Sequence, residues 1–486
     1  MNILIRNSIV SRLLRWQEQN NNKCDPMPSR KKSSILRATG ISLFCLISAP
    51  SFAETLEGAL VKAYQSNPEL NSQRASVRAT DEDVSRAKSG YRPRITASAD
   101  AGRTYYDVKT STGIGSDGYL SPRGVGLQIN QNLFNGFGTT NSVKAAESNV
   151  FGSREALRNV EQNILFNAAQ AYMNVLRDTA ILRLQRNNVE VLEEQLRQTR
   201  DRFNVGEVTR TDVAQAEARL AGARSSISAA EGNLRSSVAI YRQVVGTEPS
   251  KLNPGKPLDK ILPRTLEAAV SLGLREHPAI IAALHSTDAA EFQVKVAQSE
   301  FAPSLDVSGA VQQRYDYADR GDERLNASVV ATLTVPIYQG GEVSARVRQF
   351  KEQAGQAQLQ VDVMRDQVRA AIVSAWGQLE AAKAQVIAAV AEVAANTTAL
   401  EGVREEARVG QRTTLDVLNA QQELLNSRVN LIMAQRDRVV ASYAVAQAMG
   451  RLSVASLSLK ISEYDPSVHY EQVKGMWVGT TIPDGR

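Results

Sequence analysis

The chain has 486 residues, of which only 5 % are aromatic, and long stretches are rich in Ala, Gln, Glu, Arg, Val and Leu. This mix favours extended helices over compact globules. The formal net charge of +6 comes from the first 53 residues, which hold eight of the 57 Lys and Arg residues but only two of the 51 Asp and Glu residues. The remainder has 49 bases and 49 acids, so charge gives no argument for binding nucleic acid.

The N-terminus has the pattern of an export signal. Residues 27–53 read MPSRKKSSILRATGISLFCLISAPSFA, a basic stretch followed by an apolar run and small residues. We expect a secretory signal peptide cleaved after Ala53, with residues 1–26 as an upstream extension. The apolar run is too short to span a bilayer comfortably. Cleavage removes both cysteines, Cys24 and Cys45, so we expect no disulfide.

The rest of the chain is a tandem repeat. The sequence VGEVTRTDVAQAE at 205–217 returns as VGQRTTLDVLNAQ at 409–421, an offset of 204 residues. Near the start of each repeat, TLEG at 55–58 returns as TLEA at 265–268, an offset of 210 residues. The six-residue difference predicts a loop of variable length between residues 94 and 132.

These offsets predict the domain organisation. We expect one repeat over 54–249, a proline-rich linker over 250–264 and a second repeat over 265–452. The tail, 453–486, has no counterpart in the first repeat. It is predicted either to wrap the helices as a belt or to be disordered.

Proline-free tracts predict the helices, because helix interiors exclude proline. These tracts predict helices over 139–204 and 210–246 in the first repeat and over 343–408 and 413–449 in the second. A further helix is predicted before each strand region, over 55–89 and 265–299. The long helices of about 66 residues would be roughly 100 Å in length. Two short helices stacked end to end could therefore lie alongside one long helix, with Gly206 and Gly410 at the far tips.

Two β-hairpins are predicted at about 91–135 and 301–339. Four runs of about ten residues alternate small apolar with polar side chains, as transmembrane β-strands do. Aromatic residues at the run ends predict two girdles: Tyr91, Phe134, Phe137, Phe301 and Tyr338 on one side, and Tyr105, Tyr106, Tyr315 and Tyr317 on the other. The alternative is a pair of soluble hairpins that pack one face on the helices. If the membrane interpretation holds, four strands cannot close a barrel, so the chain must complete it with further copies of itself.

From Thr55 to about Leu452 the sequence resembles the TolC family of outer-membrane channel-tunnels. The resemblance rests on the twofold repeat, the Tyr-x-Pro and Leu-Phe-Asn-Gly strand flanks, and the VGxxTxxDV-type corners. It implies an α+β membrane protein, a homotrimer whose protomers each give four strands to a twelve-stranded transmembrane β-barrel. A long periplasmic α-helical barrel continues from it, and the protein would reside in the outer membrane.

The resemblance also implies the function and its partners. Such proteins are passive exit ducts for type I secretion and multidrug efflux. They dock through a periplasmic adaptor to an inner-membrane RND or ABC transporter, and they use no cofactor. The corners, with Val205, Gly206, Val409 and Gly410 at their tips, would meet the adaptor.

The gate residues follow from the same resemblance. Asp416 matches an acidic residue whose threefold copies ring the constriction, while Asn419 stands where a second Asp occurs in the family. Arg412 and Thr211 match a pair that holds the mouth shut. Asp212 matches another latch residue, but its tyrosine partner is replaced by Ala407, which implies a weaker or rewired latch.

A purely structural role is open for the same acidic residues. An Asp in the first turn of a helix is favoured by the helix dipole, with Thr209 or Thr211 available as N-cap. Gly206 and Gly410 would simply let the chain leave the helix.

Other chemistry has little support. The three histidines, His277, His285 and His469, show no metal-ligand spacing, and the phosphate-loop, nucleophile-elbow and HExxH motifs are absent from the sequence. We therefore expect no enzyme. His277 precedes Pro278 in the slot of Asn67, which predicts a helix-start role. A periplasmic adaptor or a structural coiled-coil envelope protein is the alternative function, disfavoured by strands inside each repeat. The cargo cannot be derived from the sequence.

Overall fold

The computed structural model describes residues 54–109, 113 and 115–483. The predicted signal peptide and both cysteines lie outside these residues.

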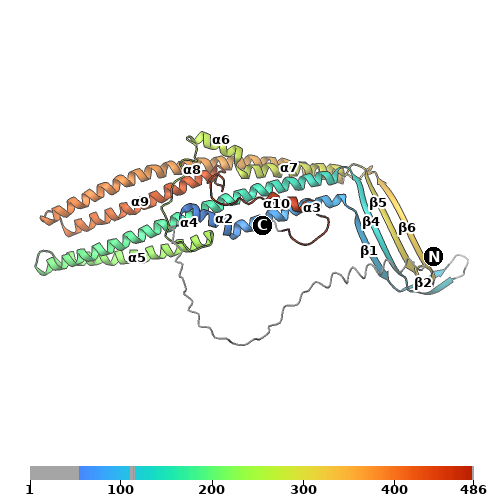
Figure 1. The fold of residues 1–486 in the computed structure, drawn as a ribbon, viewed down its shortest axis with the longest axis horizontal. Coiled ribbons are helices and arrows are strands. Elements are labelled where there is room, and N and C mark those ends of the chain that lie inside the picture. Colours follow the sequence, from blue (N-terminus) through green and yellow to red (C-terminus); the bar gives the residue numbers. More distant parts are fainter. Residues whose placement is uncertain (1–53, 110–112, 114, 484–486) are drawn as a thin grey trace, which may run out of the picture. The chain divides into compact units, whose positions relative to one another are not determined.

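The helices occur in two sets with matching lengths (Figure 1). The first set comprises α2 (Leu56–Ser66), α3 (Pro68–Lys88), α4 (Gly138–Asn204) and α5 (Arg210–Val245). The second set comprises α6 (Leu266–Glu276), α7 (Pro278–Ser299), α8 (Glu342–Arg408) and α9 (Thr414–Ala448). The long helices α4 and α8 have 67 residues each, and each packs along the shorter helix that follows it.

The single helix predicted at the start of each repeat is wrong, because each is broken at a proline. Residues Asn67 and His277 have ψ angles of 122° and 124°, outside the helical region. Steric conflict with the ring of the following proline disfavours the helical conformation at these positions. Each then caps the next helix. Asn67 Oδ1 accepts from the Glu69 amide at 2.9 Å, and His277 Nδ1 accepts from the Ala279 amide at 3.1 Å. The helix-start role predicted for His277 is thus confirmed.

The largest apolar core lies around the middle of α4. It joins α2, α5 and α9 through fully buried residues that include Leu60, Tyr172, Tyr241 and Leu452. The Tyr172 hydroxyl donates to the carbonyl oxygens of Glu54 and Asn253 at 2.8 and 2.7 Å. The start of the described chain and the linker are therefore both held on this core.

The principal sheet is antiparallel with the order β1 (Arg94–Ala101), β4 (Arg123–Asn135), β5 (Ser304–Tyr315) and β6 (Glu323–Thr334). The first hairpin lies within the predicted range 91–135, but its connection forms strands where a loop was expected. Beyond β1 the chain forms a second, two-stranded sheet of β2 (Thr104–Lys109) and β3 (Gly115–Leu120). A bond from the Gly102 amide to the Pro122 carbonyl, 2.8 Å long, marks the step between the two sheets.

One face of the principal sheet is apolar and exposed. The register pairs Leu127 with Val311 and Val311 with Ala327, which places these side chains on the same face. The opposite face has pairs such as Asn130 with Ser308. Within the described residues, Val329 on the apolar face is 81 % exposed. The soluble alternative required this face to pack on the helices, so the exposure contradicts it.

The tail packs along α3 from Tyr464 to Val473, as the belt alternative requires. It contains a short helix, α10 (Ser467–Val473), and contacts polar residues spaced three or four apart on one stripe of α3. Asp81 accepts from His469 Nδ1 at 2.9 Å in a fully buried pair, and the Ser85 hydroxyl donates to the Val473 carbonyl at 2.6 Å. Side-chain contacts thus hold the tail in place.

Candidate functional site

The two corners at the tips of the long helices have the same backbone. Gly206 and Gly410 both have φ of +80°, a left-handed conformation that glycine adopts without strain. After the first, the Glu207 amide donates to the Arg202 carbonyl at 2.9 Å. After the second, the Gln411 amide donates to the Glu406 carbonyl at 2.9 Å. Each corner is therefore a Schellman motif, which satisfies the last carbonyls of the long helix.

The helix after each corner begins with a capping box. Thr209 accepts from the Asp212 amide through its hydroxyl, and the Asp212 carboxylate accepts from the Thr209 amide at 2.9 Å. Thr413 and Asp416 repeat the arrangement, with the Thr413 amide 3.0 Å from the Asp416 carboxylate. The spacing of Gly, Thr and Asp in the duplicated sequence is therefore explained by helix termination and restart. Of the two predicted caps, Thr209 rather than Thr211 has the role.

The capping box also affects the charge of Asp416. The Thr413 amide donates to its carboxylate and, with a smaller contribution from Arg412, holds the pKa of Asp416 below its ordinary value. Asp416 is therefore ionised throughout the neutral range.

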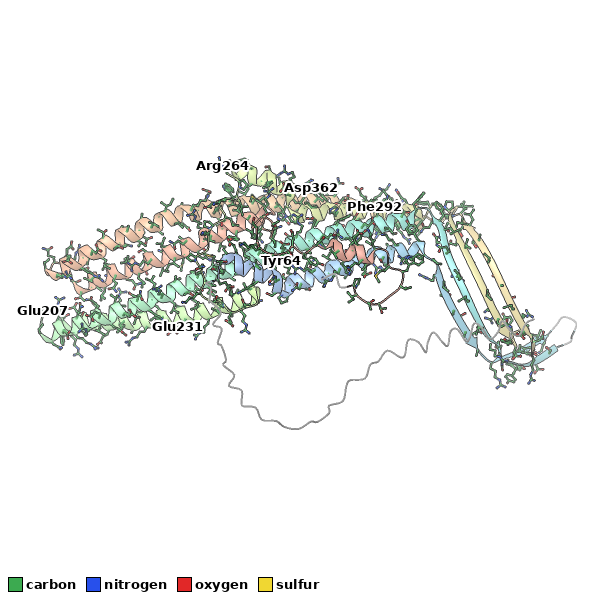
Figure 2. All side chains as sticks on the ribbon, viewed as in Figure 1. Tyr64, Glu207, Glu231, Arg264, Phe292 and Asp362 are labelled. Atoms are coloured by element: carbon green, nitrogen blue, oxygen red, sulfur yellow. The ribbon has the colours of Figure 1, made fainter. Side chains whose placement is uncertain are left out.

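The two corners line a shared cavity of about 560 Å³. Asp212 enters it from the first corner, and Arg412 with Gly410 from the second. Thr211, Asp416 and Asn419 lie outside its lining. Figure 2 labels Glu207, another lining residue, at the tip of the helices away from the sheet. The structure thus brings together part of the predicted gate.

Within the protomer, the Arg412 guanidinium is paired with Glu406, whose Oε2 lies 2.8 Å from Arg412 Nε. The structure therefore gives Arg412 a partner on its own corner rather than Thr211. Asn419 accepts from Arg219 at 2.8 Å, which joins α9 to α5. Sequence reasoning missed both Glu406 and Arg219, because neither belongs to a motif. For Glu406 a signal was available in the sequence, because the equivalent position in the first repeat, Arg202, carries the opposite charge.

The tips themselves are open to a partner. Val205 and Val409 are 73 % and 71 % exposed. A Cβ added at Gly206 or Gly410 would meet nothing within 4 Å. The tips are thus apolar points with free space around them in the protomer.

The predicted girdle residues lie at the two ends of the principal sheet. At the helical end are Tyr91, Phe134, Phe301 and Tyr338, whose exposed fractions range from 39 to 86 %. At the other end are Tyr315 and Tyr317, with Tyr105 and Tyr106 on β2 beyond them. The aromatic residues therefore bracket the apolar face of the sheet.

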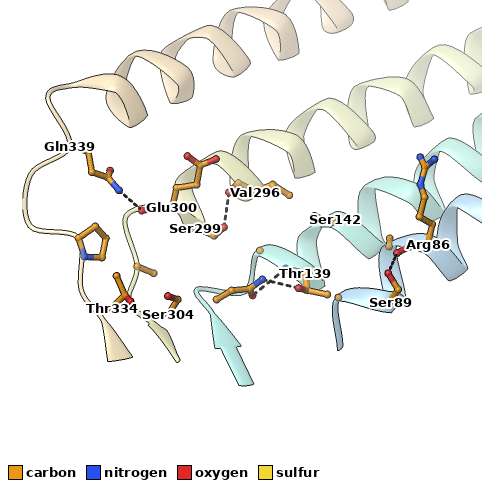
Figure 3. A pocket seen from close by; sticks show the side chains of 16 residues that line it. Arg86, Ser89, Thr139, Ser142, Val296, Ser299, Glu300, Ser304, Thr334 and Gln339 are labelled. Carbon is orange, nitrogen blue, oxygen red and sulfur yellow. Dashed lines mark hydrogen bonds between the residues drawn. The ribbon is translucent and has the colours of Figure 1, made fainter. Parts of the chain in front are cut away.

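A second cavity, of about 700 Å³, lies at the joint where the helices meet the sheet (Figure 3). Several of its polar side chains bond to neighbouring groups of the protein. The Ser299 hydroxyl donates to the Val296 carbonyl at 2.6 Å, and the Asn135 amide donates to Thr139 Oγ1 at 2.8 Å. Gly136 has φ of +62°, and a Cβ there would lie 2.4 Å from Ala302. These features describe a tightly packed turn from strand to helix rather than a reactive site.

Within the described residues, no group of three or more His, Cys, Asp or Glu side chains is placed to hold a metal ion. The functional features of the described chain are thus a membrane-type sheet, paired helical tips and the charged cavity between them.

The comparisons with known proteins agree with these features. The family model for outer membrane efflux proteins matches residues 59–247 and 269–451. The outer membrane efflux protein BepC of Brucella suis is 45 % identical over 94 % of this chain and 98 % of its own length. The outer membrane protein TolC of Escherichia coli is 27 % identical over 88 % of each chain.

Solved structures show the same fold. The CmeC outer membrane channel of Campylobacter jejuni superposes with a TM-score of 0.73 over 86 % of this chain and 89 % of its own, at 19 % identity. The predicted fold class, family resemblance and outer-membrane location are confirmed, and the family is one of transport channels. The chain belongs to the outer membrane efflux protein family and forms an exit duct in the outer membrane.

Proposed function

We propose that this exit duct is a homotrimer that passively conducts toxic compounds out of the cell while docked to a periplasmic adaptor and an inner-membrane transporter. The observation that carries the proposal is the pairing of an uncovered, lipid-type β-sheet with exposed helical tips at the other end of the helices. Such a protomer has one end suited to lipid and the other suited to a protein partner.

The trimer is supported by surfaces that the protomer leaves open. Within the described residues, β1 and β6 each pair on one side only, and an open sheet edge is not tolerated in lipid. An 18-residue stretch of α8 has a mean hydropathy of 1.3, and only 11 % of that stretch is buried in the protomer. Its exposed residues Leu359 and Ile387 are 68 % and 74 % exposed. Further copies of the chain would pair the edges and cover this helix.

We extend the proposal to the organisation of the chain. The mature protomer would consist of repeat 54–249, linker 250–264, repeat 265–452 and tail 453–486. The aromatic residues at the two ends of the sheet would lie at the two surfaces of the membrane, where such rings are enriched.

The gate would lie at the corners. Three copies of Asp416 would ring the constriction, with Asn419 beside them and Arg412, Thr211 and Asp212 holding neighbouring corners. Support comes from the shared cavity of Asp212 and Arg412 and from the ionised state of Asp416. Arg412 pairs with Glu406 within the protomer. To close the latch, Arg412 would leave Glu406 and bind Thr211 of a neighbouring corner. An Arg412→Ser variant should then show a higher single-channel conductance.

The adaptor would contact the exposed tips. A photo-crosslinking residue at Val409 should capture a periplasmic adaptor in intact cells. The same residue at Leu359, equally exposed in the protomer but within the proposed trimer interface, is the matched control and should capture another copy of the chain. Capture of the adaptor at Leu359 but not at Val409 would contradict this placement.

Efflux is favoured over protein secretion because the relative with 45 % identity is named an efflux protein. A strain that lacks the gene should become sensitive to drugs or bile salts. Loss of one secreted protein with unchanged drug sensitivity would instead support type I secretion. Recovery of the mature protein in the inner-membrane or soluble fraction would overturn the duct.

A further inference from the structure

The chain beyond α10 ends against the joint between helices and sheet. Arg92, two residues before β1 begins, donates from Nη1 to the Met476 carbonyl at 2.6 Å. Its guanidinium carbon lies 4.8 Å from the centroid of the Trp477 ring. These two contacts place Trp477 at the level where the first strand starts.

The segment that follows is unusually apolar for an exposed chain. Trp477, Val478 and Ile482 are 68, 88 and 81 % exposed. Tyr91, the residue next to Arg92, is also 52 % exposed. Tryptophan and tyrosine are enriched at the membrane–water interface, because each side chain has an apolar ring that suits the lipid and a polar group that suits the water. The tail thus adds a second aromatic residue beside one predicted to lie in the girdle.

The internal repeat supplies a comparison. At the offset of 210 residues, Arg92 corresponds to Ala302, which can neither hold a carbonyl nor stack on an indole. The tail has no counterpart in the first repeat, and its helix α10 packs on α3, the helix that precedes Arg92. The contact between Arg92 and Trp477 is therefore not a by-product of the duplicated fold.

We propose that residues 476–478 are an interfacial anchor, which inserts Trp477 and Val478 among the phospholipids of the periplasmic leaflet of the outer membrane. The lipid leaflet is the partner of this surface, because the segment lies beside the aromatic end of the membrane-type sheet. Arg92 would lie at the depth of the lipid phosphates, where its charge is favourable. The anchor would set the height of the helical part relative to the bilayer.

Tryptophan fluorescence tests the proposal directly. Of the three tryptophans, Trp16 lies in the predicted signal region, so the exported chain has Trp376 and Trp477. A Trp376→Phe variant therefore reports Trp477 alone. It would be reconstituted in vesicles of phosphatidylethanolamine and phosphatidylglycerol, with part of the lipid replaced by phospholipid brominated on the acyl chains. We expect a blue-shifted emission that loses much of its intensity to the brominated lipid.

The matched control is Trp477→Phe, which reports Trp376. That residue lies on α8, 34 positions after Glu342, about 50 Å along the helix from the joint. Its emission should be unchanged by brominated lipid. Adding Arg92→Gln to the Trp376→Phe variant should reduce the quenching of Trp477, because the tail loses its hold at the joint.

Emission from Trp477 that is insensitive to brominated lipid would overturn the anchor, whether an aqueous quencher such as iodide reaches the ring or a neighbouring protomer covers it. Channel conductance measured with the same preparation shows whether the β-strands are inserted. A conducting channel with unquenched Trp477 would therefore reject the anchor and leave the membrane placement of the sheet intact.

Discussion

The α4–α5 corner and the α8–α9 corner share one backbone but carry different charges. Both turn at a glycine with φ of +80° and restart with a Thr–Asp capping box. On the first corner Arg202 pairs with Glu207, and on the second Glu406 pairs with Arg412. The positions of Arg202 and Glu406 are equivalent, so the sign of the charge is reversed. The repeated residues therefore build the turn, while the unrepeated ones give the two corners different ion pairs.

The same contrast extends along the repeats. The cap at the start of the second helix is Asn67 in one repeat and His277 in the other. Glu161 on α4 is buried under the tail, whereas its counterpart Arg365 on α8 is paired with Asp362 at the surface. Variants at these pairs test whether the two repeats also differ in stability.

The largest effect is expected at the closing glycines. Gly246 and Gly450 have φ of +86° and +77°, so alanine costs about 1–2 kcal/mol at either position. At Gly450 the new Cβ would also lie 2.8 Å from the His277 Cα, which is backbone and cannot move aside. Overpacking of this kind adds about 1–3 kcal/mol. At Gly246 the nearest atom is the rotatable Ser66 hydroxyl, 2.7 Å away.

Gly450→Ala should therefore lower the thermal unfolding midpoint of the purified trimer more than Gly246→Ala does. Circular dichroism measures both. Equal shifts in the two variants would contradict the extra cost expected from the close contact at Gly450.

The next effect is a pH dependence specific to the second repeat. Burial lowers the pKa of His277 to about 4 from 6.5, and its Nδ1 must be unprotonated to accept the Ala279 amide. The stabilising contribution is complete above pH 6.5 and is lost as the pH falls towards 4, in total about 3 kcal/mol. His277→Asn reproduces the cap of the first repeat without a titrating group. Plotted against pH, the free energies of unfolding of wild type and variant should diverge below pH 6.5. Parallel curves would contradict the conclusion that His277 caps the helix in its neutral form.

Glu161 should give a dependence of the opposite sign. Burial raises its pKa from 4.5 to about 7, so its contribution is complete below pH 4.5 and is lost as the pH rises through 7. Glu161→Gln retains an acceptor for the Val454 amide, 3.2 Å away, and carries no charge. The variant should be more stable than wild type at pH 8, by at most about 3 kcal/mol, and equal to it at pH 4. Arg365→Gln is the control and should change neither value.

The smallest effect is expected at the capping boxes. Asp212→Ala and Asp416→Ala each remove one half of a capping box, which costs about 1 kcal/mol. Because the two boxes have matching geometry, the two variants should lower the unfolding midpoint by similar amounts. A markedly larger loss for one would mean that the corners differ in structure and not only in charge.

Much of this fold could be predicted because it depends on local signals that recur. Proline-free tracts indicated α4 and α8, and the Gly, Thr and Asp spacing indicated both corners. The break at Asn67 was missed because the predicted helix was carried across Pro68, although a proline fits only the first turn of a helix and so marks a new start. The extension over β2 and β3 was missed because it lacks clear alternation. Glu406, Arg219 and Trp477 were missed for other reasons. The partners of Arg219 and Trp477 are distant in sequence, so only the folded chain brings them together. Glu406 pairs with Arg412 six residues away, but neither the charge nor the pair is repeated at the first corner.

The central claim is that the second corner, and not the first, forms the constriction. Single-channel conductance in planar bilayers tests it most directly, with Asp416→Ala compared against Asp212→Ala, which loses the same cap. Asp416→Ala should alter cation block, whereas Asp212→Ala, which removes a latch residue but no charge from the constriction, should keep wild-type cation block. Wild-type cation block for Asp416→Ala, or the same change in both variants, would contradict the claim and leave Asp416 as a helix cap alone.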